Sequence, residues 1–350
     1  MKINSLETIK NILLFFLMVS IFLILAELSS ILIPLVLAFL LAFSFQPLII
    51  LMKEKKIPSW LIIPIIAFIS ILILFGIYWI TSSMYSDIIQ SKDFLIEKLN
   101  IRVNEVLKIF NALTDENYKF NLTTEQFVHF LKKDLLKKYG GDVATAVGNF
   151  TGSFMLFLIF YTLILFGIVN YKRYLTYVAG DVEKNTLLSN FETIQRAIYS
   201  YIIIKILVCF TTGLIVYISC LVFQIEFALF WGFLVFILNF IPSIGSIVAS
   251  IPPILMCFIQ YDSFNVTLLF LLIIAVLQFL MGNFVEPRIL GSRLQLNTFT
   301  VIFGLIFWGF LWGIPGMLVA VPLLVLMRIM FEQFPSTRVL ARIMGTSKLL

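Results

Sequence analysis

Residues 227–260 read FALFWGFLVFILNFIPSIGSIVASIPPILMCFIQ, two apolar runs that meet at the turn Ile-Pro-Ser-Ile-Gly, residues 241–245. Residues 299–330, FTVIFGLIFWGFLWGIPGMLVAVPLLVLMRIM, have the same design around Gly-Ile-Pro-Gly at 313–316. Pro and Gly interrupt helices because Pro lacks a backbone N–H and Gly adopts conformations closed to other residues. The two stretches therefore predict helical hairpins, which we call hairpin one (226–262) and hairpin two (297–331). Broken apolar helices of this kind are typical of membrane transporters.

The rest of the chain is also built for a bilayer. Of its 350 residues 61% are hydrophobic and 13% are charged, whereas about a quarter are charged in soluble domains. Further apolar runs approach or reach the ~20 residues that cross a membrane core. They lie at 11–26, 33–52, 60–81, 149–169, 201–224 and 264–284. We therefore expect an all-α polytopic membrane protein with about six spanning helices and the two hairpins.

The hairpin arms are short. The arms at 298–312 and 317–331 each hold 15 residues, fewer than the ~20 of a full crossing. Either a re-entrant hairpin or two short tilted spans fits these lengths. In both cases the chain returns to the side from which it entered.

The basic residues indicate the orientation. The net charge is +6, and 15 of the 25 Lys and Arg residues fall in the loops expected on one side, at 1–10, 53–58, 170–200, 286–296 and 328–350. The short loops of the other side contain Glu27, Glu226 and Asp262 and no basic residue. This asymmetry predicts cytoplasmic N- and C-termini. It also explains the basic excess without a nucleic-acid partner.

Three domains are predicted: transmembrane helices at 1–81 as a scaffold, an extramembrane amphipathic helical domain at 82–148, and a transmembrane transport core at 149–350 that contains both hairpins. The middle segment holds nine basic and nine acidic residues. It is either a domain for self-association or partner contact, or a solvated spacer. Within the core, residues 182–199 predict an amphipathic helix on the inner membrane face.

The helix between the hairpins carries polar groups. Ala275, Gln278, Gly282 and Glu286 recur at helical spacing and so share one face, with Asn283 beside them. An intramembrane carboxylate is a candidate functional group.

Two readings of the charges stay open at this point. Glu286 is either such a functional group or an interfacial residue paired with Arg288 or Arg293. Lys205, near the inner end of its span, is expected to extend its ammonium group to the interface.

Three patterns in order suggest a family. Residues 239–252 match N-x-I-P-x-x-G followed by I-P, residues 282–291 match G-N-x-x-E-P-x-x-x-G, and residues 313–322 match G-x-x-G-x-x-x-A-x-P. Together they resemble the signatures of the AI-2E (autoinducer-2 exporter-like) transporter family, whose second helix is similar at Pro34 and Pro47. The chain departs from the family at Ile204-Lys205, where many members have Gly-Gln.

The resemblance implies a multi-pass protein of the bacterial cytoplasmic (inner) membrane that forms a homo-oligomer. Members of the family are linked to export of autoinducer-2 and, elsewhere, to Na⁺(Li⁺)/H⁺ antiport. For this chain the resemblance implies either export of a small polar organic solute or exchange of a monovalent cation for protons. Since the sequence has no P-loop, we expect secondary transport without ATP.

The predicted binding or gating residues lie at the hairpin turns and on the helix between them. They are Asn239, Pro242, Gly245, Pro252, Gln278, Gly282, Asn283, Glu286, Pro287, Arg288, Gly291, Gly313, Pro315, Gly316 and Pro322. We expect the cargo site between the two hairpin tips.

Other functions remain as alternatives. An oligomeric channel or pore has the same physical setting, and an envelope scaffold would act through residues 82–148. An enzyme is not expected, because His129 is the only His and no metal or acid/base motif accompanies it. No metal or cofactor is predicted.

Overall fold

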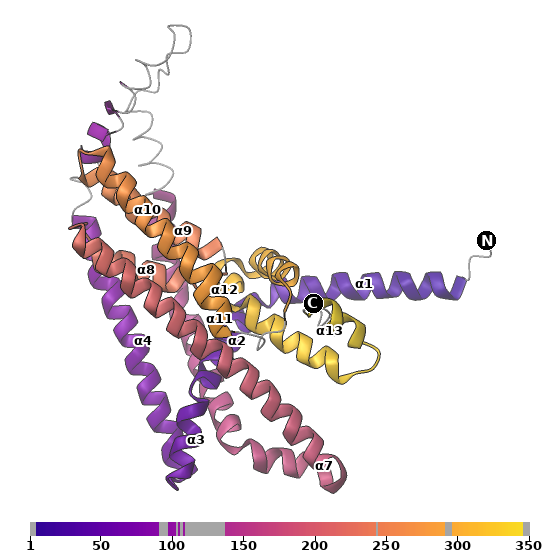
Figure 1. Ribbon diagram of the computed structural model, residues 1–350. Helices are drawn as coiled ribbons and strands as arrows, with labels where there is room; N and C mark the ends of the chain where they lie inside the picture. Colours follow the sequence, from indigo (N-terminus) through magenta and orange to yellow (C-terminus); the bar gives the residue numbers. More distant parts are fainter. Residues whose placement is uncertain are drawn as a thin grey trace. The chain divides into compact units, whose positions relative to one another are not determined.

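The computed structural model describes residues 5–90, 97–102, 104–105, 108, 137–242, 244–290 and 296–345. These residues form helices and connecting turns with no β-strand, which confirms the predicted all-α class. The helices are labelled in Figure 1: α1 (Ser5–Glu27), α2 (Ser29–Ser44), α3 (Gln46–Glu54), α4 (Ser59–Gln90), α7 (Lys137–Val222), α8 (Ala228–Leu238), α9 (Ile244–Gln260), α10 (Phe264–Leu280), α11 (Glu286–Leu290), α12 (Thr298–Gln333) and α13 (Arg338–Met344).

Most predicted spans are present. Among the described residues, five helices are long and apolar enough to cross a membrane, and the bent pair α1–α2 supplies a sixth candidate. The span predicted at 33–52 is instead divided at Phe45 into α2 and α3. Pro47 lies in the first turn of α3, where its ring would clash with the carbonyl of Phe43 if the helix continued. Pro34, by contrast, lies inside α2.

The chain divides into two compact units. Unit 1 comprises residues 1–66, 151–203 and 292–350, and unit 2 comprises residues 67–150 and 204–291. Helices α4 and α7 each contribute to both units. Hairpin one belongs to unit 2 and hairpin two to unit 1.

Hairpin two is a single apolar helix broken at Gly313. This residue has φ 63° and ψ −144°, a conformation that is essentially restricted to Gly. The two arms of α12 then pack on each other. They approach so closely that a Cβ added to Gly304 would lie 2.4 Å from Leu324 Cδ1. At the tip, Trp312 Nε1 donates a hydrogen bond to the carbonyl of Leu25 in α1 at 2.9 Å. The predicted hairpin is therefore present, and it is attached to the first helix.

Hairpin one is formed by α8 and α9 in unit 2. Its turn is so tight that a Cβ on Gly245 would lie 1.8 Å from the carbonyl oxygen of Leu238. Its two ends meet, since Gln260 Nε2 donates to the carbonyl of Gln224 at 2.6 Å and Gln260 Oε1 accepts from the N–H of Glu226 at 3.0 Å. The chain thus leaves hairpin one beside the point at which it entered.

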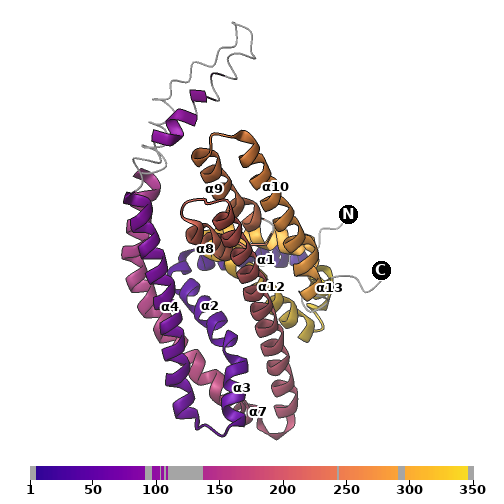
Figure 2. The same cartoon turned by 60° about the vertical axis from the view of Figure 1, so that its left-hand side comes forward.

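The core of unit 2 joins hairpin one to the long helices. Helices α9 and α10 run side by side in Figures 1 and 2, and α7 contributes Val216 and Cys220 to the same apolar cluster. Cys257 of α9 and Phe270 of α10 complete its centre with no exposed surface. Cys220 and Cys257 are free thiols here, in agreement with their interpretation as small hydrophobic residues.

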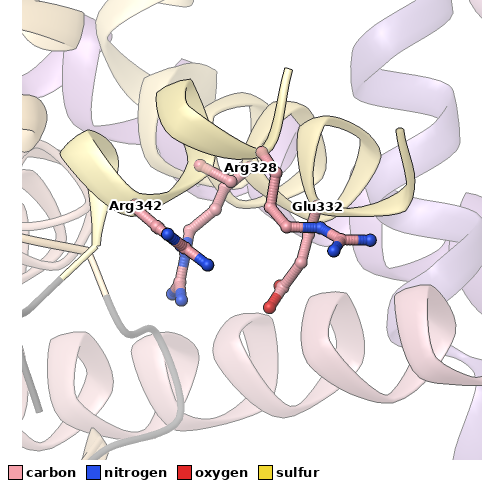
Figure 3. Close-up of a pocket in the computed structure, with 5 residues that line it drawn as sticks. Arg328, Glu332 and Arg342 are labelled. Atoms are coloured by element: carbon pink, nitrogen blue, oxygen red, sulfur yellow. The ribbon is translucent and has the colours of Figure 1, made fainter. Parts of the chain in front are cut away.

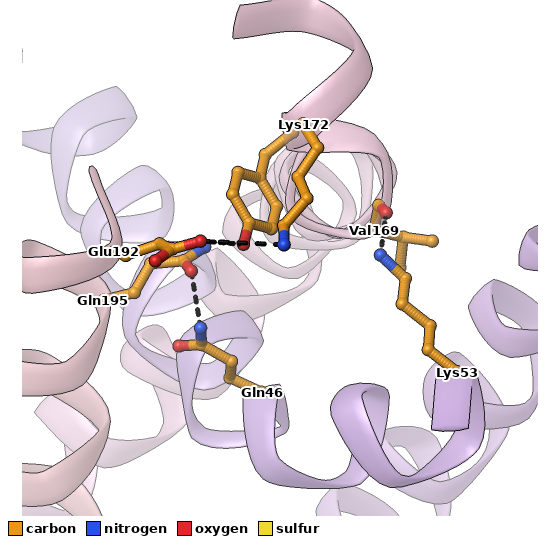
Figure 4. A network of polar contacts seen from close by, with 7 residues as sticks. Gln46, Lys53, Val169, Lys172, Glu192 and Gln195 are labelled. Carbon is orange, nitrogen blue, oxygen red and sulfur yellow. Dashed lines mark hydrogen bonds and ion pairs between the residues drawn. The ribbon is translucent and has the colours of Figure 1, made fainter. Parts of the chain in front are cut away.

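Helix α7 turns back on itself within unit 1. Tyr171 Oη donates to Glu192 Oε1 at 3.1 Å across 21 residues, although a straight helix of that length spans about 30 Å. Figure 4 shows the polar contacts around this reversal. Gln46 Nε2 donates to Gln195 Oε1 at 2.5 Å, and Gln195 has no exposed surface. Gln195, within the segment 182–199 that was predicted to lie on the inner membrane face, is therefore covered by protein.

Lys53 lies beside the same reversal. Its Nζ donates to the carbonyl of Val169. Burial, with a smaller contribution from the nearby charge of Lys172, lowers the pKa of Lys53. This member of the predicted inner-loop cluster is thus a structural contact of unit 1.

The predicted extramembrane domain at 82–148 falls largely outside the described residues. A described contact within unit 2 joins it to the turn between α9 and α10: Arg102, 4% exposed, forms ion pairs with Glu105 and with Asp262 of that turn. Both ends of the contact to Asp262 were predicted on the outer side.

Replacement of Gly313 by Ala tests the break in hairpin two. We expect Gly313→Ala to destabilise the protein by about 1–3 kcal/mol, because a Cβ is strained at this φ and ψ. Thermal unfolding in detergent measures the effect. Gly167→Ala in α7 is the control, since its Cβ would meet nothing within 4 Å and Ala favours a helix. Equal melting temperatures for the two variants would contradict this account.

Candidate functional site

A π-helical turn places Glu286 at the end of α10. Residues Met281–Val285 form this turn, and the N–H of Glu286 bonds to the carbonyl of Met281. A π-turn inserts one residue into a helix, and such turns are frequent at functional sites. The insertion brings Gln278 and Glu286 to about the same face, two turns apart.

Lys205 of α7 forms an ion pair with Glu286. Its ammonium nitrogen contacts Glu286 Oε1. The Lys205 side chain is 1% exposed, while that of Glu286 is 21% exposed. The prediction that Lys205 extends to the interface was therefore wrong, because its side chain is buried. Of the two arginines considered as partners of Glu286, Arg288 is exposed and Arg293 lies outside the described residues.

The burial of Lys205 explains why the pair forms. Removing an ammonium group from water costs several kcal/mol, and an opposite charge at hydrogen-bond distance offsets that cost. Breaking such a pair leaves an uncompensated charge in the helix bundle. The pair thus joins α7 to the residue that follows the π-turn. Cys209, one helical turn further along α7, is also fully buried.

Two amides of the predicted site have buried atoms that find no hydrogen-bond partner among the described residues. These atoms are Oδ1 of Asn239, at the end of α8, and Nε2 of Gln278, in α10. A buried polar atom without a partner is costly unless a solute or water supplies the bond. Asn283 differs, since its Nδ2 donates to the carbonyl of Phe279 at 3.1 Å on an exposed face.

Prolines in α9 free further polar groups. Pro252 is followed by Pro253 inside this helix. Neither residue has an N–H, so the carbonyls of Val248 and Ala249 lack their usual helical donors. At membrane depth, such carbonyls are tolerated where protein or a polar cavity surrounds them.

The remaining predicted residues fall into four groups. Pro242 and Gly245 form the turn of hairpin one, where the N–H of Ile244 donates to the carbonyl of Pro242 at 2.6 Å. Gly282 and Pro287 are exposed. Gly291 lies outside the described residues. The residues of hairpin two, Gly313, Pro315, Gly316 and Pro322, all lie in unit 1, so the approach of the two hairpin tips stays a prediction.

The residue that sequence reasoning missed is Lys205. A signal existed, because it is the one basic residue inside a predicted span, and it departs from the family pattern. As regards metals, no group of three or more His, Cys, Asp or Glu side chains lies together in the part of the chain that the structure describes.

Long apolar helices, two broken hairpins and buried polar groups define the class, a multi-pass membrane protein built to move solutes. The profile of the family described as AI-2E family transporter matches residues 11–336. The chain therefore belongs to the AI-2E family of membrane transport proteins.

Individual relatives agree with this assignment. The AI-2 transport protein TqsA of Escherichia coli (strain K12) is 29% identical over 311 residues, which cover 87% of this chain and 86% of TqsA. A candidate transport protein of Haemophilus influenzae is 26% identical over 324 residues, covering 91% of this chain and 90% of that protein. Both names indicate transport.

A double-mutant cycle tests the buried ion pair. We expect Lys205→Met and Glu286→Gln each to cost about 3–5 kcal/mol, because each leaves the partner buried and unpaired. The double variant should recover much of this loss. Unfolding by denaturant in mixed micelles gives the coupling free energy.

A second pair in the same chain is the control. Lys172 and Glu192 lie 3.7 Å apart with side chains 70% and 36% exposed, and exposed pairs contribute about 1 kcal/mol or less. A coupling free energy for Lys205–Glu286 no larger than that of Lys172–Glu192 would show that burial adds nothing to the pair.

Proposed function

We propose that this protein is a secondary transporter that exports a small polar organic solute and that Glu286, with Lys205, is its polar centre. The ion pair between these residues at the π-turn carries the proposal. A buried charge pair is expensive in a membrane protein, and such pairs mark solute or ion pathways. Its acidic partner, Glu286, lies on the segment 282–291 that bears the family signature.

Other polar groups in unit 2 support a polar cargo. Asn239 Oδ1 offers an acceptor and Gln278 Nε2 offers donors, and both atoms are buried without partners among the described residues. The carbonyls of Val248 and Ala249, which lack their usual helical donors, add acceptors in the same unit. Such groups suit a solute with several hydroxyl or carbonyl groups. The name of the relative TqsA makes AI-2 the first cargo to test.

Exchange of Na⁺ or Li⁺ for protons is the second candidate, favoured by the carboxylate of Glu286. A monovalent cation would have to displace the ammonium group of Lys205, which already neutralises Glu286. For this reason we place organic-solute export first.

The proposal includes an orientation and an assembly. The charge asymmetry of the loops supports cytoplasmic termini in the bacterial cytoplasmic membrane. Family resemblance supports a homo-oligomer. Since no ATP-binding motif is present in the sequence, transport would be driven by an ion gradient or by the solute's own concentration gradient.

Flux into and out of proteoliposomes tests the function. Vesicles loaded with AI-2 should release it with saturable kinetics when they contain the wild-type protein. Glu286→Gln should slow release by about tenfold or more, the equivalent of about 1.4 kcal/mol or more. Glu226→Gln is the control, because Glu226 lies in a predicted outer loop and outside the Lys205 pair.

The alternatives give different results in the same vesicles. A Na⁺- or Li⁺-dependent change of internal pH without AI-2 release would replace the first candidate by the second. Unitary currents and release that does not saturate would indicate a channel. Equal rates for Glu286→Gln and wild type would remove the ion pair from the mechanism.

A further inference from the structure

A pocket lined by arginines lies in unit 1, where α12 ends and α13 begins. It measures about 400 Å³ and is lined by Arg328 and Glu332 of α12 and by Arg338, Ala341 and Arg342 of α13. Figure 3 shows Arg328, Glu332 and Arg342 around it. None of these residues belongs to the predicted transport site.

The pocket is held in place by Asn297. The backbone N–H of Asn297 donates to the carbonyl of Met344 at 2.9 Å. Its side-chain Nδ2 donates to the carbonyl of Ile343 at 2.6 Å, and its Oδ1 accepts from the N–H of Thr300 at 2.7 Å. One residue therefore caps α12 at its start and fixes the end of α13.

Two further contacts fix the ends of α12 and α13 around the pocket. Thr337 Oγ1 donates to the carbonyl of Phe331 at 2.9 Å, which fixes the turn between α12 and α13. A Cβ on Gly345 would lie 3.3 Å from the guanidinium carbon of Arg328. A Gly at this position thus leaves space for the Arg328 head group. These contacts fix the ends of α12 and α13 from which the arginine side chains extend.

The positive charge of the pocket lining favours an anionic ligand. Three arginines and one glutamate line it, so the lining side chains carry a net charge of +2. Guanidinium groups bind phosphate oxygens through two parallel hydrogen bonds, a geometry that Lys cannot reproduce. Arg338 and Arg342 are one helical turn apart on α13 and so share a face.

The surface beside the pocket is apolar. Val339, Leu340 and Ile343 of α13 are 62%, 47% and 62% exposed. A helix with exposed apolar residues beside arginines is typical of segments that lie at a membrane interface. A ligand that meets both surfaces has a phosphate next to hydrocarbon chains, which is the chemistry of a phospholipid.

We propose that the arginine pocket between α12 and α13 binds the phosphate group of an anionic phospholipid. The acyl chains lie along Val339, Leu340 and Ile343. The bound lipid anchors α13 and, through Asn297 and Arg328, both ends of hairpin two. The site acts independently of the cargo that the protein carries.

Lipid binding to the purified full-length protein in a neutral detergent tests this proposal. Native mass spectrometry counts bound lipids while phosphatidylglycerol or phosphatidylcholine is added, and thermal unfolding reports the accompanying stabilisation. Wild type should bind phosphatidylglycerol about tenfold more tightly than phosphatidylcholine, since only the first carries a net charge. Arg338→Gln/Arg342→Gln should lose this preference.

The matched control is Lys55→Gln/Lys56→Gln, which removes two exposed basic residues from another predicted inner loop. It should retain the preference. An equal loss in both double variants would assign the effect to general surface charge and overturn the site. So would an unchanged preference in the arginine variant.

A third arm separates the two sources of phosphate. Inorganic phosphate at equal ionic strength should stabilise wild type far less than phosphatidylglycerol. Stabilisation by inorganic phosphate alone, with no response to the lipid, would overturn the assignment to a phospholipid. Size-exclusion profiles and the flux assay establish that the exposed arginine substitutions leave the protein folded.

Discussion

Unit 2 depends on the cost of keeping one ammonium group out of water. Lys205 is 1% exposed, and a charge in that setting is sustained by a carboxylate at hydrogen-bond distance. Glu286, which directly follows the π-turn at the end of α10, meets this need. The helices that carry hairpin one are thereby linked to the polar segment that follows α10. Residues 282–291, which carry a family signature, therefore include the carboxylate that pairs with Lys205.

The hairpins follow from a constraint on the backbone. Every N–H and C=O group at membrane depth needs a partner, so a helix can break there only where protein surrounds the break. Hairpin two meets this requirement with Gly313, whose conformation is closed to other residues, and with the packing of its arms. Hairpin one uses a turn in which Gly245 approaches the carbonyl of Leu238. Both turns were visible in the sequence because Pro and Gly have few other roles at such positions.

Sequence patterns predicted the features that depend on local chemistry. Hydropathy gave the spans, Pro and Gly gave the hairpins, and the three motifs gave the family. Features that depend on contacts distant in sequence were missed. The Lys205–Glu286 pair joins residues 81 positions apart, and the buried amides of Gln46 and Gln195 are 149 apart. Hydropathy treats each such residue as an isolated polar group. It therefore cannot reveal that two of them form an ion pair or a hydrogen bond with each other. The reversal of α7 was hidden in the same way, since its amphipathic pattern fits a protein surface as well as a membrane.

The three cysteines have a practical consequence. Cys209, Cys220 and Cys257 are each fully buried within unit 2. A thiol in that position is shielded from polar alkylating reagents, which act on exposed thiolates. The natural protein therefore provides an unreactive background for site-directed labelling. A single cysteine introduced on a loop or hairpin would report its accessibility from either side of the membrane, without prior removal of the native thiols.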